Sequence, residues 1–385
     1  MGKIYTALGL MSGTSLDGID FSIIQTNGKE YLSLSGNNYL EFSNTLRQKI
    51  REIKSKITST NKCKEIIKSD EYKDLSNEIT MFHQEGIRQI VGYGGGRPID
   101  VIAFHGITLW HKPSDKYTHQ IGDAQLLKKS IEKYKNLKNT KIIFNFREND
   151  ILNGGQGAPL TPIYHKALMK HLKIVDPRLI VNIGGITNVT YLNRGNIFST
   201  DIGPGNCLID KWIKKNFDKD FDEYGKISLE GKINLNIADN FLNKLKKTQK
   251  NKNISYDTSD FNLSEFDKLD PKDGAATLTY ITAKTILNFA RDLDLKRIII
   301  CGGGRLNQAI LKNLKKDRFN ISLIDDVTSS QNDNRILNLD GDFIESQAFA
   351  YLAIRSYLNL PISFPTTTGV KNDCTGGVVF NFKEQ

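Results

Sequence analysis

The sequence is poor in cysteine: its 385 residues include only four, at positions 63, 207, 301 and 374, with no Cys-x-x-Cys pair. This spacing excludes a disulfide framework and a cysteine-based zinc site. No apolar run approaches the roughly 20 residues of a membrane-spanning helix, and the N-terminus lacks the pattern of a secretory signal. We therefore expect a soluble, cytoplasmic protein with no membrane partner.

Positive charge exceeds negative charge, because 53 lysines and arginines stand against 43 acidic residues and give a formal net charge of +10. Such a surface suits nucleic acid or a small anionic substrate. The surplus lysines lie in Lys/Asn-rich stretches at 128–141 and 244–252, which lack the interleaved aromatic residues of a base-stacking surface. We therefore predict a small anionic ligand and no nucleic acid, with a basic nucleic-acid binder as the alternative.

Short β-branched runs alternate with amphipathic stretches along the chain, which predicts an α/β fold. At this length, two domains or lobes are expected. The polar stretch 242–273 is interpreted as a helical subdomain or a surface excursion. Strands are predicted at 4–10, 19–25, 101–105, 141–146, 179–183, 189–192 and 297–301, and helices at 43–56, 76–89, 123–135, 206–217, 275–292, 307–314 and 342–358.

A strand followed by a glycine-rich turn recurs at 9–18, 184–188 and 302–307. Glycine lets the backbone approach a bound group closely, and exposed N–H groups suit phosphates. Three such turns predict a nucleotide held between two lobes, although a polar turn or a bulged hairpin would explain any one of them. The Gly-Gly-Gly-Arg string at 94–97 leads into Pro98 and a strand, so we expect a surface loop there.

Charged and polar side chains near these turns are candidates for chemistry. Asp201 precedes Gly203-Pro204-Gly205, a spacing that fits a simple helix cap poorly and favours a carboxylate that faces a cleft. For His105 the alternative is a purely structural role, and for Glu345 it is a favourable interaction with the helix dipole. These candidates are His105, Arg147, Asp150 and Glu345.

The string Gly9-Leu10-Met11-Ser12-Gly13-Thr14-Ser15-Leu16-Asp17-Gly18 resembles the signature of the anhydro-N-acetylmuramic acid kinase family. One departure is Asn145, where the family usually has Asp ahead of Phe-Arg. The number and order of the matching strings make the resemblance specific. They follow in family order over nearly the whole chain, at 104–106, 120–123, 146–160, 182–189, 201–206, 302–305 and 341–345.

The resemblance implies the fold of the actin, hexokinase and heat-shock ATPase group, in which two RNase H-like lobes hold ATP in a central cleft. We expect an N-terminal lobe at 1–144 plus 359–385 and a C-terminal lobe at 145–358. The resemblance also implies that Asp201 is the catalytic carboxylate and that His105, Arg147, Asp150 and Glu345 bind the sugar. ATP binding is expected at Gly13, Thr14, Ser15, Leu16, Asp17, Gly18, Ile19, Asp20, Gly184, Gly185, Asn188, Gly203, Gly205, Asn206, Gly302, Gly303 and Gly304.

The reaction that the resemblance implies uses ATP and Mg²⁺, whose direct ligands the sequence does not identify. Asp201 would take a proton from a water that attacks C1 of a 1,6-anhydro sugar, and the freed O6 would accept the γ-phosphoryl group. The product would be N-acetylmuramate 6-phosphate, in peptidoglycan recycling and amino-sugar catabolism. A kinase for another anhydro sugar such as levoglucosan, and a catalytically silent sugar or nucleotide sensor, are the alternatives. A homodimer is common in the family.

Overall fold

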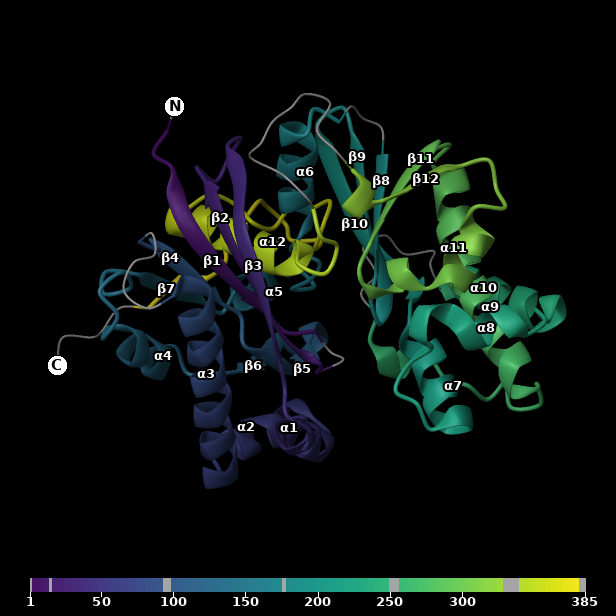
Figure 1. Cartoon of the computed structure of the whole chain (residues 1–385), viewed down its shortest axis with the longest axis horizontal. Coiled ribbons are helices and arrows are strands. Elements are labelled where there is room, and N and C mark those ends of the chain that lie inside the picture. The colour runs from purple at the N-terminus through teal and green to yellow at the C-terminus, as the bar shows by residue number, and fades with distance from the viewer. Residues whose placement is uncertain are drawn as a thin grey trace. The chain divides into compact units, whose positions relative to one another are not determined.

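The computed structural model describes residues 2–13, 16–92, 98–174, 178–248, 256–327 and 339–380. These residues form two compact units, whose elements are labelled in Figure 1. The first unit runs to Lys173 and resumes at Phe343, and the second runs from Ile174 to Val327 and from Leu339 to Asp342. The Gly-Gly-Gly-Arg string at 94–97, expected as a loop, lies outside the described residues.

The first unit is built on a mixed sheet with the strand order β13-β7-β4-β1-β2-β3. β1 pairs antiparallel with β2, and β2 with β3, whereas β1 pairs parallel with β4, and β4 with β7. A separate hairpin, β5–β6, follows β4. The strands are β1 (Tyr5–Met11), β2 (Gly18–Thr26), β3 (Leu32–Glu41), β4 (Val101–Phe104), β5 (Ile107–Lys112), β6 (Tyr117–Ile121), β7 (Lys141–Phe144) and β13 (Val378–Val379).

The second unit repeats this scheme with the order β10-β9-β8-β11-β12. β8, β9 and β10 are antiparallel neighbours, and β11 runs parallel to both β8 and β12. Each unit therefore has the strand order 3-2-1-4-5 of an RNase H-like sheet, which confirms the predicted α/β architecture. The strands are β8 (Arg178–Ile183), β9 (Ile186–Asn193), β10 (Asn196–Pro204), β11 (Arg297–Cys301) and β12 (Asn320–Leu323).

Helices cover both faces of the first sheet. Gly86 of α3 has no room for a side chain because the Phe21 ring of β2 lies against it. On β1, a Cβ at Gly9 would collide with the Ser346 carbonyl of α12. The helices of this unit are α1 (Asn44–Lys56), α2 (Thr60–Ile66), α3 (Asp70–Val91), α4 (Ala124–Ile131), α5 (Glu148–Leu152), α6 (Pro162–His171) and α12 (Ile344–Tyr357), with the 3₁₀ turn η1 (Pro113–Asp115).

The predicted lobe boundaries need correction, because 145–173 and 343–358 belong to the first unit. Residues 343–358 belong to the first unit because α12 packs closely against Gly9 of β1. Residues 145–173 are joined to α12 by α6, where the Tyr164 hydroxyl donates to Gln347 Oε1 at 2.7 Å. Helical periodicity predicts that 342–358 is a helix, but it does not say which sheet the helix covers.

The second unit buries one face of its sheet under α10, α7 and α9. Trp212 of α7 is fully buried, and its indole N–H donates to the Pro271 carbonyl at the start of α10 at 2.7 Å. Gly274 leaves the space that this ring occupies. The elements are α7 (Cys207–Phe217), α8 (Lys226–Glu230), α9 (Leu235–Thr248), α10 (Pro271–Asp292) and α11 (Gln308–Leu314), with the 3₁₀ turns η2 (Glu223–Gly225), η3 (Thr258–Asp260), η4 (Gly303–Leu306) and η5 (Ile324–Asp326).

Helix starts follow capping chemistry that is visible in the sequence. Ser43, Ser69, Asp123 and Asn307 each accept backbone N–H groups of the first turn that follows them. The cap at Ser69 also explains why α3 begins at Asp70 and not at the predicted residue 76. Among the helices that the structure describes, none is long and apolar enough to span a membrane.

Candidate functional site

The predicted site residues gather at one edge of each sheet. In a 3-2-1-4-5 sheet, strands 1, 3, 4 and 5 all end at the same edge, where the carboxyl ends of parallel strands meet. In the first unit this edge carries the β1–β2 loop and the segments after β4 and β7. In the second it carries the β8–β9 turn, the end of β10 and the segment after β11. Each unit therefore carries its own group of predicted site residues at this edge.

The β1–β2 loop of the first unit was expected to bind phosphate. Ser12 is 5% exposed, and its hydroxyl has no hydrogen-bond partner among the described residues. Leu16 has a left-handed φ of 62°, its N–H donates to the Gly13 carbonyl, and its carbonyl accepts from Arg47 Nε at 2.9 Å. The predicted ligands Thr14 and Ser15 lie outside the described residues.

Two predicted ATP-binding residues, Leu16 in this loop and Ile19 in β2, have buried side chains. Leu16 is 4% exposed and Ile19 is fully buried, and both belong to the core of the first unit. Burial therefore leaves only the backbone groups of these two residues available to a ligand. Gly18 is also constrained by packing, because a Cβ there would collide with the Leu40 carbonyl of β3.

Asp17 of this loop and Asp20 of β2 both raise the pKa of one tyrosine, Tyr39. Burial raises the pKa of Tyr39 to about 12, and the negative charges of Asp17, Glu41 and Asp20 add to the rise. Asp20 lies opposite Tyr39 in the β2–β3 pair, and Asp17 is exposed. The two carboxylates thus create negative potential at the edge of this sheet.

His105 and Arg147 form a pair behind the surface. His105 follows β4, is 3% exposed, and stacks on Phe349 of α12 with ring centroids 4.4 Å apart. Arg147 Nε donates to His105 Nε2 at 3.3 Å. Because a guanidinium has only donors, Nε2 is the acceptor and the proton of the neutral ring is on Nδ1. Burial, and then the charge of Arg147, holds the pKa of His105 well below its ordinary value.

Asp150 was predicted to bind the sugar, but the structure gives it a different task. It is completely buried, and its Oδ1 accepts the Gly157 N–H at 2.5 Å while its Oδ2 accepts the Thr368 hydroxyl. Arg147 Nη1 donates to the Gly157 carbonyl at 2.8 Å. Asp150 therefore clamps the glycine turn that holds Arg147, and it has no exposed oxygen for a ligand.

Glu345 joins this group from the first turn of α12 and is half-buried. Burial lowers the pKa of Arg147, and the charges of Glu345 and Asp150 oppose that drop. A fully ionised guanidinium and a carboxylate are therefore close in space at the edge of the sheet. The structure brings together all four predicted sugar-side residues, of which Arg147 and Glu345 keep exposed surface.

Asp201 of the second unit ends a row of polar residues across its sheet. It lies in β10, opposite Asn188 of β9, which in turn lies opposite Asn182 of β8. Directly paired residues share one face of a sheet, so these three side chains project together. A bulge between Asp201 and Gly203 bends the strand at this point. Asp201 is therefore not a helix cap: it lies within β10, and the helix predicted to follow it, α7, begins at Cys207.

The turn Gly184–Gly185 is packed against the segment that follows β10. The N–H groups of Gly205 and Asn206 donate to the carbonyls of Gly185 and Gly184 at 3.0 and 2.7 Å. A Cβ at Gly205 would collide with the Gly184 carbonyl. Gly205 and Asn206, which were predicted to bind ATP, thus use their N–H groups to join the two turns.

The segment Gly302–Gly304 follows β11 and forms a 3₁₀ turn before α11. Gly302 has a φ of 77°, and a Cβ there would collide with Asn182 Oδ1. Gly304 lies against the Ile183 side chain, whereas the nearest atom to a Cβ at Gly303 is Asn206 Nδ2 at 3.9 Å. Gly303 is therefore the glycine of the three with open space beside it.

Arg305, which the motif contained but to which no role was given, is 3% exposed and binds three carboxylates. Its guanidinium donates to Asp325 at 2.8 Å, to Asp342 at 2.6 Å and to Asp340 at 3.3 Å. Burial would lower the pKa of Arg305, but the bonds to Asp342 and Asp325 outweigh this and raise it. The chain crosses into the first unit directly after Asp342, so Arg305 fixes the segment that leads to Glu345.

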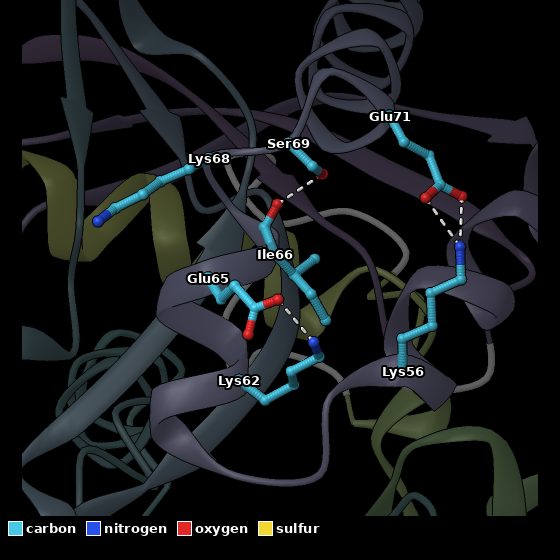
Figure 2. Close-up of a pocket in the computed structure, with 7 residues that line it drawn as sticks. All are labelled: Lys56, Lys62, Glu65, Ile66, Lys68, Ser69 and Glu71. Carbon is cyan, nitrogen blue, oxygen red and sulfur yellow. Dashed lines mark hydrogen bonds and ion pairs between the residues drawn. The ribbon is translucent and has the colours of Figure 1, made fainter.

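A surface pocket on the first unit lies apart from these residues. It is formed where α1, α2 and α3 meet, and its charged side chains are shown in Figure 2. Lys56 pairs with Glu71 at 2.6 Å and Lys62 with Glu65 at 2.7 Å, so most of its charges are neutralised within the pocket. None of the predicted site residues lines it.

Paired RNase H-like units with glycine turns at the edge of each sheet define the class of ATPases to which actin and the sugar kinases belong. A family model described as anhydro-N-acetylmuramic acid kinase matches residues 5–382. The chain belongs to this family and is therefore an enzyme, a kinase.

Curated relatives match over the full length. A protein of Pelagibacter ubique named anhydro-N-acetylmuramic acid kinase is 39% identical over 98% of this chain and 99% of its own. A protein of Agrobacterium fabrum with the same name is 34% identical over 98% of this chain and 99% of its own. Among solved structures, a Clostridium difficile dehydratase activator with bound ADPNP is 13% identical over 91% of this chain and 94% of its own, with a TM-score of 0.39. The fold is defined by the strand order of the two sheets.

Proposed function

We propose that this kinase uses ATP to open the 1,6-anhydro ring of 1,6-anhydro-N-acetylmuramic acid with water and to phosphorylate O6. The substrate is the one named by the family and its full-length relatives. The products are N-acetylmuramate 6-phosphate and ADP, in the cytoplasmic recycling of peptidoglycan. The observation that carries the proposal is the half-buried Asp201 carboxylate at the bulged end of β10, beside two glycine turns.

Asp201 is the general base in this proposal. Its carboxylate takes a proton from water, the water oxygen forms a bond to C1, and the C1–O6 bond breaks. The electron pair of that bond stays on O6, which attacks the γ-phosphorus, and ADP leaves. A positioned general base contributes about 10²–10⁴-fold to the rate. The row formed by Asn182, Asn188 and Asp201 supplies amide groups beside the base, which supports this role.

The sugar-side roles divide into contact and positioning. Arg147 and Glu345 contact the sugar, because they keep exposed surface where the predicted residues gather. His105 and Asp150 are positioning residues. His105 accepts a hydrogen bond from the Arg147 guanidinium, and Asp150 holds the turn whose Gly157 carbonyl also binds that guanidinium. A guanidinium held in one orientation binds oxygen acceptors with geometric specificity, and this suits a substrate with a lactyl carboxylate.

The nucleotide-side roles fall to backbone and carboxylate groups. Gly303 has the open backbone that approach to a phosphate requires. Mg²⁺ in kinases is held by substrate phosphates, water and one or two carboxylates, and Asp17 and Asp20 are the fitting pair at the loop. When bound, the ion would offset the charge of the phosphates.

The test of this function is ADP release from Mg-ATP with three sugars. We expect release with 1,6-anhydro-N-acetylmuramic acid and none with levoglucosan or free N-acetylmuramic acid. Release with levoglucosan alone would keep the chemistry but replace the substrate. No release with any of the three would contradict the kinase proposal and favour a sensor.

The role of Asp201 is tested by Asp201→Asn, which keeps the shape of the side chain but removes the base. We expect turnover to fall by about 10³-fold, with ATP binding retained. The matched control is Asp267→Asn, which changes an exposed carboxylate of the same unit that pairs with Lys215 at 2.7 Å. Normal turnover in Asp201→Asn would refute the assignment of the base.

A further inference from the structure

The sequence motifs assign no function to the polar stretch 242–273. The second half of this stretch nevertheless contacts Asp201, the proposed base. α9 ends at Thr248, and Tyr256 is where the described chain resumes. The backbone N–H of Tyr256 donates to Asp201 Oδ2 at 2.8 Å, across 55 positions of sequence. Both residues belong to the second unit, so this contact lies within one compact body.

The turn that carries this N–H is anchored to the rest of the unit. The Tyr256 ring packs on Phe261 with ring centroids 5.2 Å apart, and Phe261 is 8% exposed within the core. Lys211 Nζ donates to the Thr258 carbonyl at 2.6 Å and to the Phe261 carbonyl at 3.4 Å. A capping box between Asp257 and Asp260 closes the turn itself.

One of these anchors, Lys211, comes from α7, the helix that begins just after the bulge in β10. Lys211 lies on its exposed side, so the helix that follows Asp201 also holds the turn that returns to Asp201. A hydrogen-bond donor that is fixed from two directions keeps its direction and requires no reordering when the acceptor reacts. The N–H of Tyr256 therefore meets the requirements of a preorganised partner.

We propose that Tyr256 is a positioning residue for the reaction, whose backbone N–H holds the Asp201 carboxylate in its productive orientation. This rests on the proposed function of Asp201 as the base. A donor to Oδ2 favours the ionised carboxylate from which a general base must start, and it fixes the carboxylate plane. The polar stretch thus has a function: it brings this N–H to the base.

The sharpest test replaces Tyr256 with its α-hydroxy acid, so that the bond between residues 255 and 256 becomes an ester. This change removes one N–H and keeps every side chain. We expect kcat to fall about 10–100-fold, because a misplacement of about 1 Å costs about 10²-fold. KM for ATP and the melting temperature should change little. Tyr256→Phe keeps both the N–H and the ring, so it should retain most of the kcat that the ester variant loses.

A second test loosens the turn without touching the bond. Lys211→Met removes the two bonds to the turn, and we expect kcat to fall a few-fold. The matched control is Lys215→Met, one turn further along α7, where Nζ pairs with Asp267 at 2.7 Å. That control should keep kcat within twofold.

The outcomes distinguish the proposed role of Tyr256 from the proposed role of Asp201 as the base, on which it rests. Wild-type kcat in the ester variant overturns the role of Tyr256, and so does a loss that follows a drop in melting temperature. Equal losses in Lys211→Met and Lys215→Met also overturn it, because they would reflect α7 and not the turn. If Asp201→Asn is active, the assignment of the base fails, whatever the ester variant does.

Discussion

The two units share a strand order but fill the same edge with different chemistry. In the first unit, strands 1 and 2 are joined by residues 12–17, whereas in the second the pair Gly184–Gly185 suffices. After strand 4, each unit uses a left-handed glycine, Gly106 with a φ of 70° and Gly302 with a φ of 77°. In the first unit, however, His105 precedes that glycine and accepts from Arg147. One scaffold thus carries two different groups of site residues, because the loops and not the sheet carry the chemistry.

The units also differ in how they respond to acid. All six histidines of the chain lie before residue 172, in the first unit, and the second unit has none. Burial lowers the pKa of His83 and of His165 to about 4, and burial together with Arg147 holds the pKa of His105 well below its ordinary value. These three rings are at most 3% exposed.

The largest expected effect is therefore acid unfolding of the first unit. Below pH about 6.5 the unfolded chain protonates these histidines while the folded unit does not, so stability falls as the pH falls from about 6.5 towards 4. Each buried histidine costs about 1.4 kcal/mol of unfolding free energy per pH unit in this window. Hydrogen exchange at pH 7 and pH 5 should show loss of protection in the first unit before the second.

The control for this prediction is His83→Met, which fills similar space and does not titrate. In this variant the loss of stability per pH unit should be smaller than in the wild type. Earlier loss of protection in the second unit would contradict the histidine explanation, because that unit has no histidine to protonate.

The next largest effect concerns the sugar side of the first unit. Arg147→Lys keeps the charge but loses the planar donor set that reaches both His105 and the Gly157 carbonyl. We expect kcat/KM for the sugar to fall about 10²-fold, with KM for ATP nearly unchanged. Arg88→Lys is the matched control, since Arg88 pairs with Glu85 within the same helix. An equal change in kcat/KM for the sugar and in KM for ATP would contradict the assignment of Arg147 to the sugar.

The smallest expected effect compares two adjacent glycines of the second unit. Gly304→Ala places a methyl group against the Ile183 side chain and should lower the unfolding free energy by about 1–3 kcal/mol. Gly303→Ala has open space and should leave stability unchanged while KM for ATP rises several-fold. Chemical unfolding and ATP titration of both variants check this. A Gly304→Ala variant as stable as the wild type would show that Ile183 of β8 can move to accept the methyl group.

Local signals in the sequence predicted many elements well. The run at 297–301 forms β11 with those bounds, and Asn307 caps the helix predicted to begin there. By contrast, β3 and β10 were not predicted. β3 is a largely exposed edge strand without an apolar run, and β10 contains the polar residues around Asp201. Their existence depends on pairing with β2 and β9, which is not a local property.

The candidate site likewise combines features that local motifs predict with features that depend on distant contacts. Motifs identified His105, Arg147, Asp150 and Glu345, and the fold brings them together. What the motifs did not reveal is that Asp150 is buried and holds a turn, because its partner Thr368 is 218 positions away. They also gave no role to Arg305, whose three carboxylate partners come from two later segments.

The sequence by itself determined the α/β class, the family, the glycine turns and the helix caps, since these depend on residues within a few positions of one another. Only the tertiary structure decided which polar groups meet. The Tyr256 N–H reaches Asp201 and the Asp150 carboxylate reaches Thr368 through contacts that no local pattern encodes. A buried polar group must find a partner, and the partner is chosen by how the chain packs.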